Sequence, residues 1–216
     1  MLIPRTFHMF WDGPPPPDYV TEAMASWAPL HSGWEIRTWD ASTGRAALRS
    51  DLADLWDRVE QVSPKSNVWQ FRTNLVRLQV LHDQGGVWVD ADLRALRNVE
   101  PLIGDCEAFT SRENPSFVNN GFTGCVQGHP FYADMLGRVR DRVLAMPRAR
   151  SNRQCGPHLF TETIRRHPSV RVLPTELIYP VGLDDLERLD DDHAASGAFT
   201  VHLWHHRRSV LAGSQH

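Results

Sequence analysis

Cysteine, lysine and long apolar runs are all scarce in this sequence of 216 residues, and each shortage argues against a class of protein. The three cysteines, Cys106, Cys125 and Cys155, form no Cys-x-x-Cys pair. They therefore disfavour a disulfide scaffold or a zinc ribbon and favour reduced thiols. No apolar run reaches the ~18 residues of a membrane-spanning helix, and no basic segment followed by an apolar one opens the chain. We expect no membrane span, no signal peptide and a cytoplasmic location.

The charge balance gives no sign of a nucleic-acid partner. The formal net charge is -3 at pH 7, and Lys65 is the one lysine among 23 basic residues. Hydrophobic residues make up 41% and charged residues 23%, as in ordinary globular proteins. No repeat, low-complexity tract or linker interrupts the chain. This length and composition predict a single domain over residues 1–216.

Strand and helix patterns alternate through the first half of the chain. Strands are predicted at residues 3–10, 34–39, 87–89, 108–111, 121–126, 170–173, 178–179 and 199–203. Helices are predicted from Asp18 onward and at residues 44–59, 63–84, 130–145 and 158–166, with a polar loop at 112–120. This order favours an α/β fold with a mainly parallel central sheet. Ligands of such sheets bind beyond the carboxyl ends of the strands.

Two aspartates, Asp90 and Asp92, follow directly after the predicted strand 87–89. Carboxylates at this spacing can reach one hard divalent cation such as Mg²⁺ or Mn²⁺. A lone Asp-x-Asp is common in loops, but here Gly85-Gly86 and a buried strand aim both side chains. Phosphatases of the haloacid-dehalogenase type also place Asp-x-Asp after a strand, and they need a lysine further along the chain. Because Lys65 lies upstream, we disfavour that alternative.

The stretch from Arg72 to Leu93 contains RTNLVR and LHDQGGVWVDADL. It resembles the DXD-containing sugar transferase family, which includes initiating α-1,6-mannosyltransferases and is related to the glucosyltransferase domains of large clostridial toxins. Further matches follow in the family's order. They are IPRTFHMFW at 3–11, SW at 26–27, GWEIRTWD at 33–40, NNGF at 119–122, GHPF at 128–131, GPHLFT at 156–161 and HLW at 202–204. The resemblance covers about residues 3 to 210, and the joint order of the motifs makes it specific.

This resemblance implies a GT-A fold and a metal-dependent glycosyltransferase that retains the anomeric configuration. The donor would be a UDP- or GDP-linked sugar, the cofactor Mn²⁺ or Mg²⁺, and the acceptor is not identified. Asp92 would be a direct metal ligand, and Asp90 would contact the ribose or a metal-bound water. The predicted catalytic residues are Asp90, Asp92 and Arg77.

The resemblance also assigns the donor pocket. Trp11 would stack on the base, and Arg77 would grip the donor sugar together with position 74. Asn120 would line the sugar pocket. His202 would reach the metal or the diphosphate, although His205 and His206 compete for that role. Arg207 and Arg208 are alternative diphosphate contacts.

Position 74 departs from the family pattern, because Asn74 stands where the family has an aspartate. An amide keeps an acceptor oxygen but loses the charge, so the donor sugar is left open between a hexose and an N-acetylhexosamine. This departure also keeps a second interpretation open, namely a non-catalytic module that binds a nucleotide sugar.

Overall fold

A six-stranded sheet forms the centre of the computed structural model, which describes residues 2–189, 193 and 196–205. The strand order is β2-β1-β3-β6-β5-β7. Only β6 runs against the other five, since it pairs antiparallel with β3 and β5 while the remaining pairs are parallel. A second sheet pairs β4 with β8. The strands are β1 (Thr6–Phe10), β2 (Glu35–Trp39), β3 (Gly86–Val89), β4 (Leu93–Ala95), β5 (Ala108–Asn114), β6 (Phe117–Cys125), β7 (Arg171–Leu173) and β8 (Thr200–His202).

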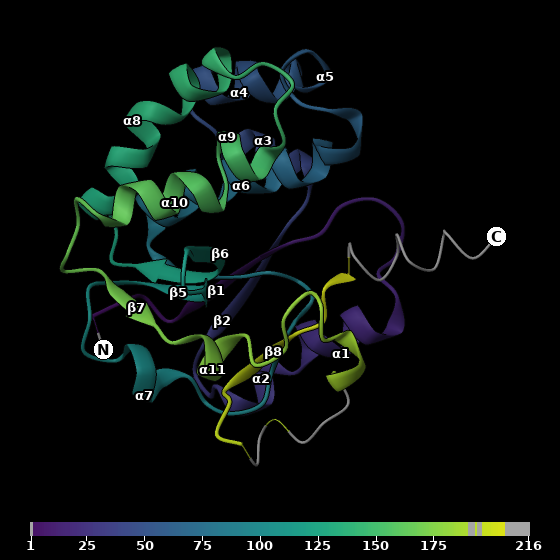
Figure 1. Ribbon diagram of the computed structural model, residues 1–216, viewed down its shortest axis with the longest axis vertical. Helices are drawn as coiled ribbons and strands as arrows, with labels where there is room; N and C mark the ends of the chain where they lie inside the picture. Colours follow the sequence, from purple (N-terminus) through teal and green to yellow (C-terminus); the bar gives the residue numbers. More distant parts are fainter. Residues whose placement is uncertain (1, 190–192, 194–195, 206–216) are drawn as a thin grey trace.

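Helices cover both faces of the central sheet (Figure 1). One layer holds α3 (Ala41–Ala47), α4 (Ser50–Asp57), α5 (Val59–Val62), α6 (Val68–Gln84), α8 (Pro130–Ala145), α9 (Ser151–Gln154) and α10 (Pro157–Ile164). The other holds α1 (Asp18–Ala25), α2 (Trp27–Leu30), α7 (Glu100–Ile103), α11 (Thr175–Ile178) and the small β4-β8 sheet. The turns η1 (Lys65–Asn67) and η2 (Leu186–Arg188) are short 3-10 helices. Among the described residues, none of these helices has the length and apolar character needed to cross a membrane.

Alternation along the strands divides the core between the two faces. Phe7 and Met9 of β1 pack in the cluster on the α2 side, whereas Phe10 of β1 and Trp88 of β3 pack in the cluster under α6 and α8. This is the period of two that a sheet buried on both faces requires. The predicted α/β class with a mainly parallel sheet is therefore confirmed.

The pair Gly85-Gly86 lets β3 approach β1 closely. Both glycines have positive φ, 67° and 90°. A Cβ on Gly86 would lie 2.8 Å from the carbonyl oxygen of Thr6 and 2.9 Å from Nε2 of His8. Only glycine adopts this backbone conformation without strain while leaving that space empty. The pair thus fixes the direction in which β3 carries the aspartates that follow it.

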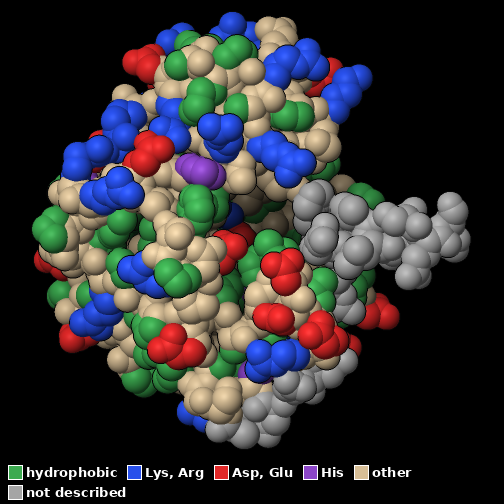
Figure 2. Space-filling view, viewed as in Figure 1, with side chains coloured by type: hydrophobic (Ala, Val, Ile, Leu, Met, Phe, Trp, Pro, Cys, Tyr) green, Lys and Arg blue, Asp and Glu red, His purple; other side chains and the backbone are tan. Residues whose placement is uncertain are grey.

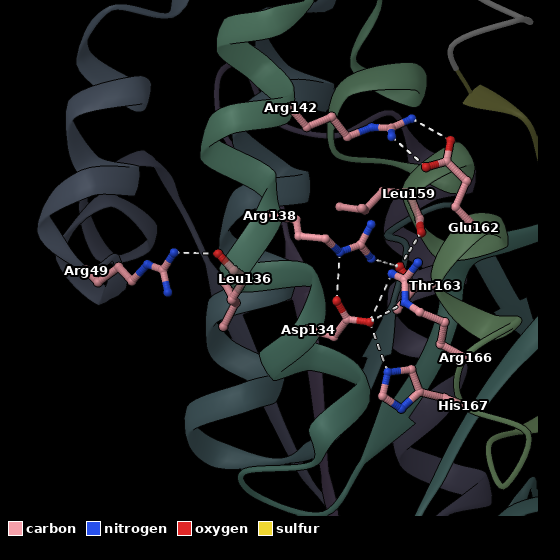
Figure 3. A network of polar contacts seen from close by, with 10 residues as sticks. All are labelled: Arg49, Asp134, Leu136, Arg138, Arg142, Leu159, Glu162, Thr163, Arg166 and His167. Atoms are coloured by element: carbon pink, nitrogen blue, oxygen red, sulfur yellow. Dashed lines mark hydrogen bonds and ion pairs between the residues drawn. The ribbon is translucent and has the colours of Figure 1, made fainter.

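Ion pairs hold α8 against α10, the helix whose first residue borders the site (Figure 3). Asp134 of α8 accepts a hydrogen bond from Arg166, just after α10, at 3.0 Å, and Arg138 of α8 donates to the hydroxyl of Thr163 on α10 at 2.6 Å. Arg142 of α8 donates both terminal nitrogens to the carboxylate of Glu162 on α10. A bidentate pair of this kind restricts the relative orientation of the two helices.

The helix and loop predictions need three corrections. The predicted helix 44–59 is three helices, because Leu48 and Arg49 are extended, and the predicted helix 63–84 begins as η1 and becomes α6 only at Val68. The predicted loop 112–120 is part of the β5-β6 hairpin, in which Thr110 donates to the carbonyl of Asn119 and Asn119 donates to Glu113. The predicted strand 178–179 is wrong as well. Those apolar residues are buried at the end of α11, which a short apolar run cannot distinguish from a strand.

The three cysteines are buried free thiols, as the sequence predicts. Burial raises the pKa of Cys125, and it raises that of Cys155 to about 12. Both are therefore protonated thiols at neutral pH and belong to the core rather than to a reactive site.

Acid should destabilise this fold through His8, which is buried beneath the glycine pair. Nε2–H of His8 donates to the carbonyl of Gly85 at 3.1 Å, and Nδ1 accepts from the indole N–H of Trp39 at 3.2 Å. Burial lowers the pKa of His8 to about 4, although the bond to Gly85 acts in the opposite direction. The unfolded chain therefore binds a proton at His8 as the pH falls below about 6.5, whereas the folded chain resists it until about pH 4.

We expect this linkage to remove roughly 2–3 kcal/mol from the free energy of unfolding between about pH 7 and pH 4.5. Urea unfolding at both values measures it. His8→Gln keeps a polar side chain that does not titrate. The variant should therefore lose less free energy of unfolding over the same pH interval, by the amount given above. Equal losses in the two proteins would contradict the assignment to His8.

Candidate active site

A cavity of about 540 Å³ opens at the carboxyl ends of β1 and β3, within the size range of small-molecule sites. One wall is built from residues that follow strands, among them Trp11, Asp90 and Asp92. The opposite wall is helical and comes from α6, α9 and the first residue of α10. Figure 2 shows the molecule hollowed between the helical layer and the part below it. The site therefore lies where ligands of open α/β sheets bind.

The floor of this cavity is an ion pair between a buried arginine and the first aspartate of the motif. Nη2 of Arg77 donates to Oδ1 of Asp90 at 2.6 Å, and the Arg77 side chain is only 3% exposed. The indole N–H of Trp88 donates to the same oxygen at 3.1 Å, and the Arg77 guanidinium lies over the Trp88 ring. Oδ2 of Asp90 faces Gly121 of β6, where a Cβ would come within 2.6 Å. A glycine at position 121 therefore leaves the space that this carboxylate occupies.

Asn74 links the ion pair to β6. Its Oδ1 accepts from Nη1 of Arg77 at 2.6 Å and from Nδ2 of Asn120 at 2.9 Å. The amide nitrogen of Asn74 faces the other way, toward Gly156. A hydrogen bond between the Asn74 side chain and Cys155 lowers the pKa of Cys155 and so partly offsets the rise that burial causes. Both acceptor positions of the carbonyl oxygen are thus used by the protein. In this arrangement Asn74 holds Arg77 and Asn120 in place.

The second aspartate is bound by the segment around β8. Nε2 of His202 lies 3.2 Å from Oδ1 of Asp92, and the backbone N–H of His205 donates to Oδ2 at 2.7 Å. Burial raises the pKa of Asp92, but the charge and hydrogen bond of His202 outweigh it, together with the N–H of His205. The net effect lowers the pKa to about 2, so Asp92 is a carboxylate at neutral pH.

Three side chains from distant parts of the chain converge at this point. Ligand atoms of Asp90, Asp92 and His202 all lie within 4.8 Å of one another. Two carboxylate oxygens and one imidazole nitrogen suit Mn²⁺, and the carboxylates suit Mg²⁺. The donor set and its spacing therefore fit one divalent cation.

The structure separates the histidines that competed for this role. The His205 side chain is hydrogen-bonded to the Tyr19 hydroxyl, and its ring packs edge-on against Trp11 at 5.5 Å. Within the described part of the chain, His202 is therefore the histidine of the cluster. His206, Arg207 and Arg208 lie outside the described residues.

Trp11 also borders the cavity, as its place at the end of β1 predicts. Its indole N–H donates to the carbonyl of Pro14 at 2.9 Å, which fixes the ring against the proline-rich loop. The ring is partly exposed and so presents apolar surface to a ligand. The cavity therefore brings Trp11, Asn74, Arg77, Asp90, Asp92, Asn120 and His202 together.

Sequence reasoning missed Trp69, which lines the mouth of the cavity. It is 45% exposed and lies on α6 at the same face as Thr73 and Arg77, which follow at intervals of four residues. That spacing is visible in the sequence and would have placed Trp69 on the same face of the helix as Arg77. The polar segment Ser151-Asn152 was missed too, because no local pattern connects it with α6.

Comparison with known proteins finds a similar family and similar sequences. Residues 17–109 match the family described as "Glycosyltransferase sugar-binding region containing DXD motif". Inositol phosphoceramide mannosyltransferase 3 of Schizosaccharomyces pombe is 29% identical over 134 residues, which are 62% of this chain and 36% of that protein. The chain thus spans about a third of the length of this curated relative.

Solved structures show the same fold at low sequence identity. PaToxG glycosyltransferase is similar with a TM-score of 0.55 at 14% identity, over 90% of this chain and 74% of that one. The UDP-bound glycosyltransferase domain of the YGT toxin gives 0.51 at 11% identity, over 79% of each chain. The predicted GT-A fold is confirmed by these likenesses. The family match over residues 17–109 confirms the resemblance seen in the sequence.

Proposed function

We propose that this protein is a metal-dependent, retaining glycosyltransferase. It would move a hexosyl or N-acetylhexosaminyl group from a UDP- or GDP-sugar to a hydroxyl of an acceptor. The observation that carries the proposal is the convergence of Asp90, Asp92 and His202 beside the buried guanidinium of Arg77, inside a cavity at the strand ends. Anionic metal ligands next to a fixed cation suit a substrate that carries both phosphate and sugar.

The triad of Asp90, Asp92 and His202 would hold Mn²⁺ or Mg²⁺. When bound, such an ion supplies positive charge that offsets the charge of a leaving diphosphate. Asp92 is ionised at neutral pH, and its two carboxylate oxygens are oriented by His202 and by the His205 N–H. Asp90 is held by Arg77 and offers its other oxygen, Oδ2.

Trp11 of the strand-end wall and the residues around the Arg77–Asp90 ion pair on the floor suit the rest of the donor. The partly exposed ring of Trp11 would stack on the base, an interaction that tolerates either uracil or guanine. Arg77 and Asn120 would face the sugar hydroxyls, with Asn74 setting their positions through the two bonds that its carbonyl accepts. The UDP bound to the YGT toxin domain is consistent with a nucleotide donor for this fold.

Retention would follow from transfer on the face that the diphosphate leaves. Among the described residues, the carboxylates that line the cavity are Asp12, Asp90 and Asp92, and each already holds a protein group. This supports a mechanism without an enzymatic nucleophile. The acceptor oxygen would form the new bond to the anomeric carbon as the bond to phosphate breaks, and the acceptor proton would pass to the departing phosphate oxygen.

The alternative is a module that binds a nucleotide sugar without transferring it. The observation behind it is the neutral amide of Asn74 where the family has a carboxylate, which leaves Arg77 with one charged partner. Purified protein assayed with a panel of UDP- and GDP-linked hexoses and N-acetylhexosamines and Mn²⁺ separates the two. Tight calorimetric binding with neither hydrolysis nor transfer would favour the module.

Replacing Asp92 should test the metal site. Asp92→Asn removes the ionised ligand, so we expect loss of transfer and at least a tenfold weaker binding of Mn²⁺, measured by electron paramagnetic resonance of the free ion. Asp12→Asn is the matched control, because Asp12 lines the cavity but lies outside the cluster, and it should bind Mn²⁺ normally. Near-normal turnover of Asp92→Asn would remove Asp92 from the mechanism.

Asn74 gives a second prediction. Asn74→Asp keeps an oxygen for Arg77 and Asn120 while adding a charge beside the guanidinium, so it should fold and change the preferred donor or raise activity on a plain hexose. Asn74→Ala leaves both donors without their acceptor and should cost about 1–3 kcal/mol of unfolding free energy. Urea unfolding and the donor panel measure the two effects. Identical donor ranking and rates for wild type and Asn74→Asp would show that position 74 does not influence the sugar pocket.

A further inference from the structure

Apart from Asn74 and Arg77 of α6, the helical wall of the cavity has no part in the proposed donor site. The remaining part consists of the start of α6 and the segment around α9, with Trp69, Thr73, Ser151 and Asn152 lining the cavity. Trp69 precedes Arg77 by eight residues, which is about 12 Å along a helix. The helical wall therefore extends from the Arg77–Asp90 ion pair on the cavity floor to Trp69 at the cavity mouth.

Trp69 is an exposed aromatic ring that the structure holds in place. The guanidinium of Arg72 lies 5.3 Å from the centre of its ring and 4.8 Å from that of Trp56, a residue of the core. Arg72 thus stacks between the two rings and fixes the orientation of Trp69 from one side. The rest of the Trp69 ring is left open, since the residue is 45% exposed and borders the cavity. A fixed aromatic face offers apolar contact at a low cost in side-chain entropy.

The groups beside Trp69 suit the hydroxyls of a ring-shaped ligand. The hydroxyl of Thr73 lies one turn further along α6, and Asn152 brings a side-chain amide from α9. Hydroxyl and amide groups both donate and accept, so they can match either sense of a ligand hydroxyl. An aromatic face bordered by such groups is chemically complementary to a sugar or cyclitol, which has apolar C–H faces and a polar rim.

Two exposed arginines flank the residues of α9 that line this wall. Arg150 and Arg153 are exposed and are the chain neighbours of Ser151 and Asn152, so their backbones lie beside the cavity. No carboxylate among the described residues forms an ion pair with either arginine or with Lys65, which precedes Trp69 by one turn. Some arginines of the same layer are neutralised, as Arg142 is by Glu162 (Figure 3).

The charge of the surface is divided in the same way. Lys and Arg side chains gather over the helical layer above the hollow, whereas several Asp and Glu lie below it (Figure 2). Charges within about 8–10 Å of the mouth act on a ligand there at ordinary ionic strength. An incoming anion is therefore favoured on the helical wall.

We propose that this wall is the acceptor site and that the acceptor is an anionic hydroxylated ring, a sugar or cyclitol carrying a phosphate or carboxylate. Its ring stacks on Trp69, and Arg150 and Arg153 attract its charge. Naming this ligand the acceptor rests on the proposed glycosyl transfer, but binding of the ligand can be measured without turnover.

The first test is direct binding. Saturation-transfer NMR is recorded on methyl hexosides, their 6-phosphates and hexuronates, with the nucleotide diphosphate present. We expect the charged compounds to bind more tightly than the neutral ones, and Trp69→Ala to weaken binding of the charged compounds at least tenfold, a change of about 1.4 kcal/mol. Trp69→Phe keeps an aromatic face and should retain most of the affinity for the charged compounds. Leu144→Ala removes another exposed apolar side chain and should leave that affinity unchanged. Unchanged binding in Trp69→Ala would overturn the stacking assignment.

The second test separates acceptor from donor. Trp69→Ala should raise the acceptor KM at least tenfold while leaving donor hydrolysis and the nucleotide Kd as in wild type. Trp11→Ala should raise the nucleotide Kd and leave the acceptor KM as in wild type. If Trp69→Ala instead raises the nucleotide Kd and leaves acceptor KM alone, Trp69 is the base platform and the proposal is wrong. Wild-type protein that hydrolyses the donor but transfers to no compound of the panel would also overturn the acceptor class.

The third test concerns charge. The double variant Arg150→Gln/Arg153→Gln should weaken binding of the phosphates and uronates about tenfold, with no effect on the neutral hexosides, and raised salt should act in the same direction on wild type. Arg165→Gln is the matched control, since Arg165 is exposed at the far end of α10. Equal affinity of wild type for charged and neutral rings would overturn the anionic part of the proposal.

Discussion

The ion pair between Arg77 and Asp90 is the interaction on which the site depends. A guanidinium that is only 3% exposed has lost nearly all of its water, and removing a charge from water costs several kcal/mol unless partners replace the solvent. Asp90 supplies the opposite charge, Asn74 a carbonyl oxygen and Trp88 an aromatic face. These partners come from α6 and from β3 and its end. Satisfying one buried cation therefore fixes the helix relative to the end of the strand.

Strand register then brings in the third member of the cluster. β4 and β8 pair antiparallel with Leu93 opposite His202, and Leu93 is the residue after Asp92. That register sets the His202 imidazole beside the Asp92 carboxylate, and it turns the following backbone so that the N–H of His205 also reaches Asp92. The low pKa of Asp92 is thus a product of sheet pairing between segments more than a hundred residues apart. Side chains held in this way would be oriented for a metal ion before the ion binds.

The two walls of the cavity differ in the chemistry they offer. The strand-end wall and the floor hold ion-paired and hydrogen-bonded groups, which suit the phosphates and sugar of a donor. The helical wall holds an exposed aromatic ring and is flanked by two exposed arginines that form no ion pair within the described part of the chain, which suit a charged acceptor. The separation arises because the carboxyl ends of parallel strands gather polar loops at one edge, while α6 runs alongside and presents one face to the same space. The cytoplasmic location and the single-domain organisation remain predictions from sequence.

Local patterns were enough to predict much of this protein. Two glycines, a short apolar strand and Asp90-Ala91-Asp92 are consecutive, so backbone geometry alone ties the aspartates to a strand end. The helical spacing of Asn74 and Arg77 is likewise a property of neighbours. The choice of His202 over His205, the pairing of residues 112–120 into the β5-β6 hairpin and the place of Trp69 beside Asn152 were decided only by the tertiary structure. Each of these depends on contacts between segments far apart in the chain, and the free energy of such contacts comes from packing, desolvation and register rather than from local propensity.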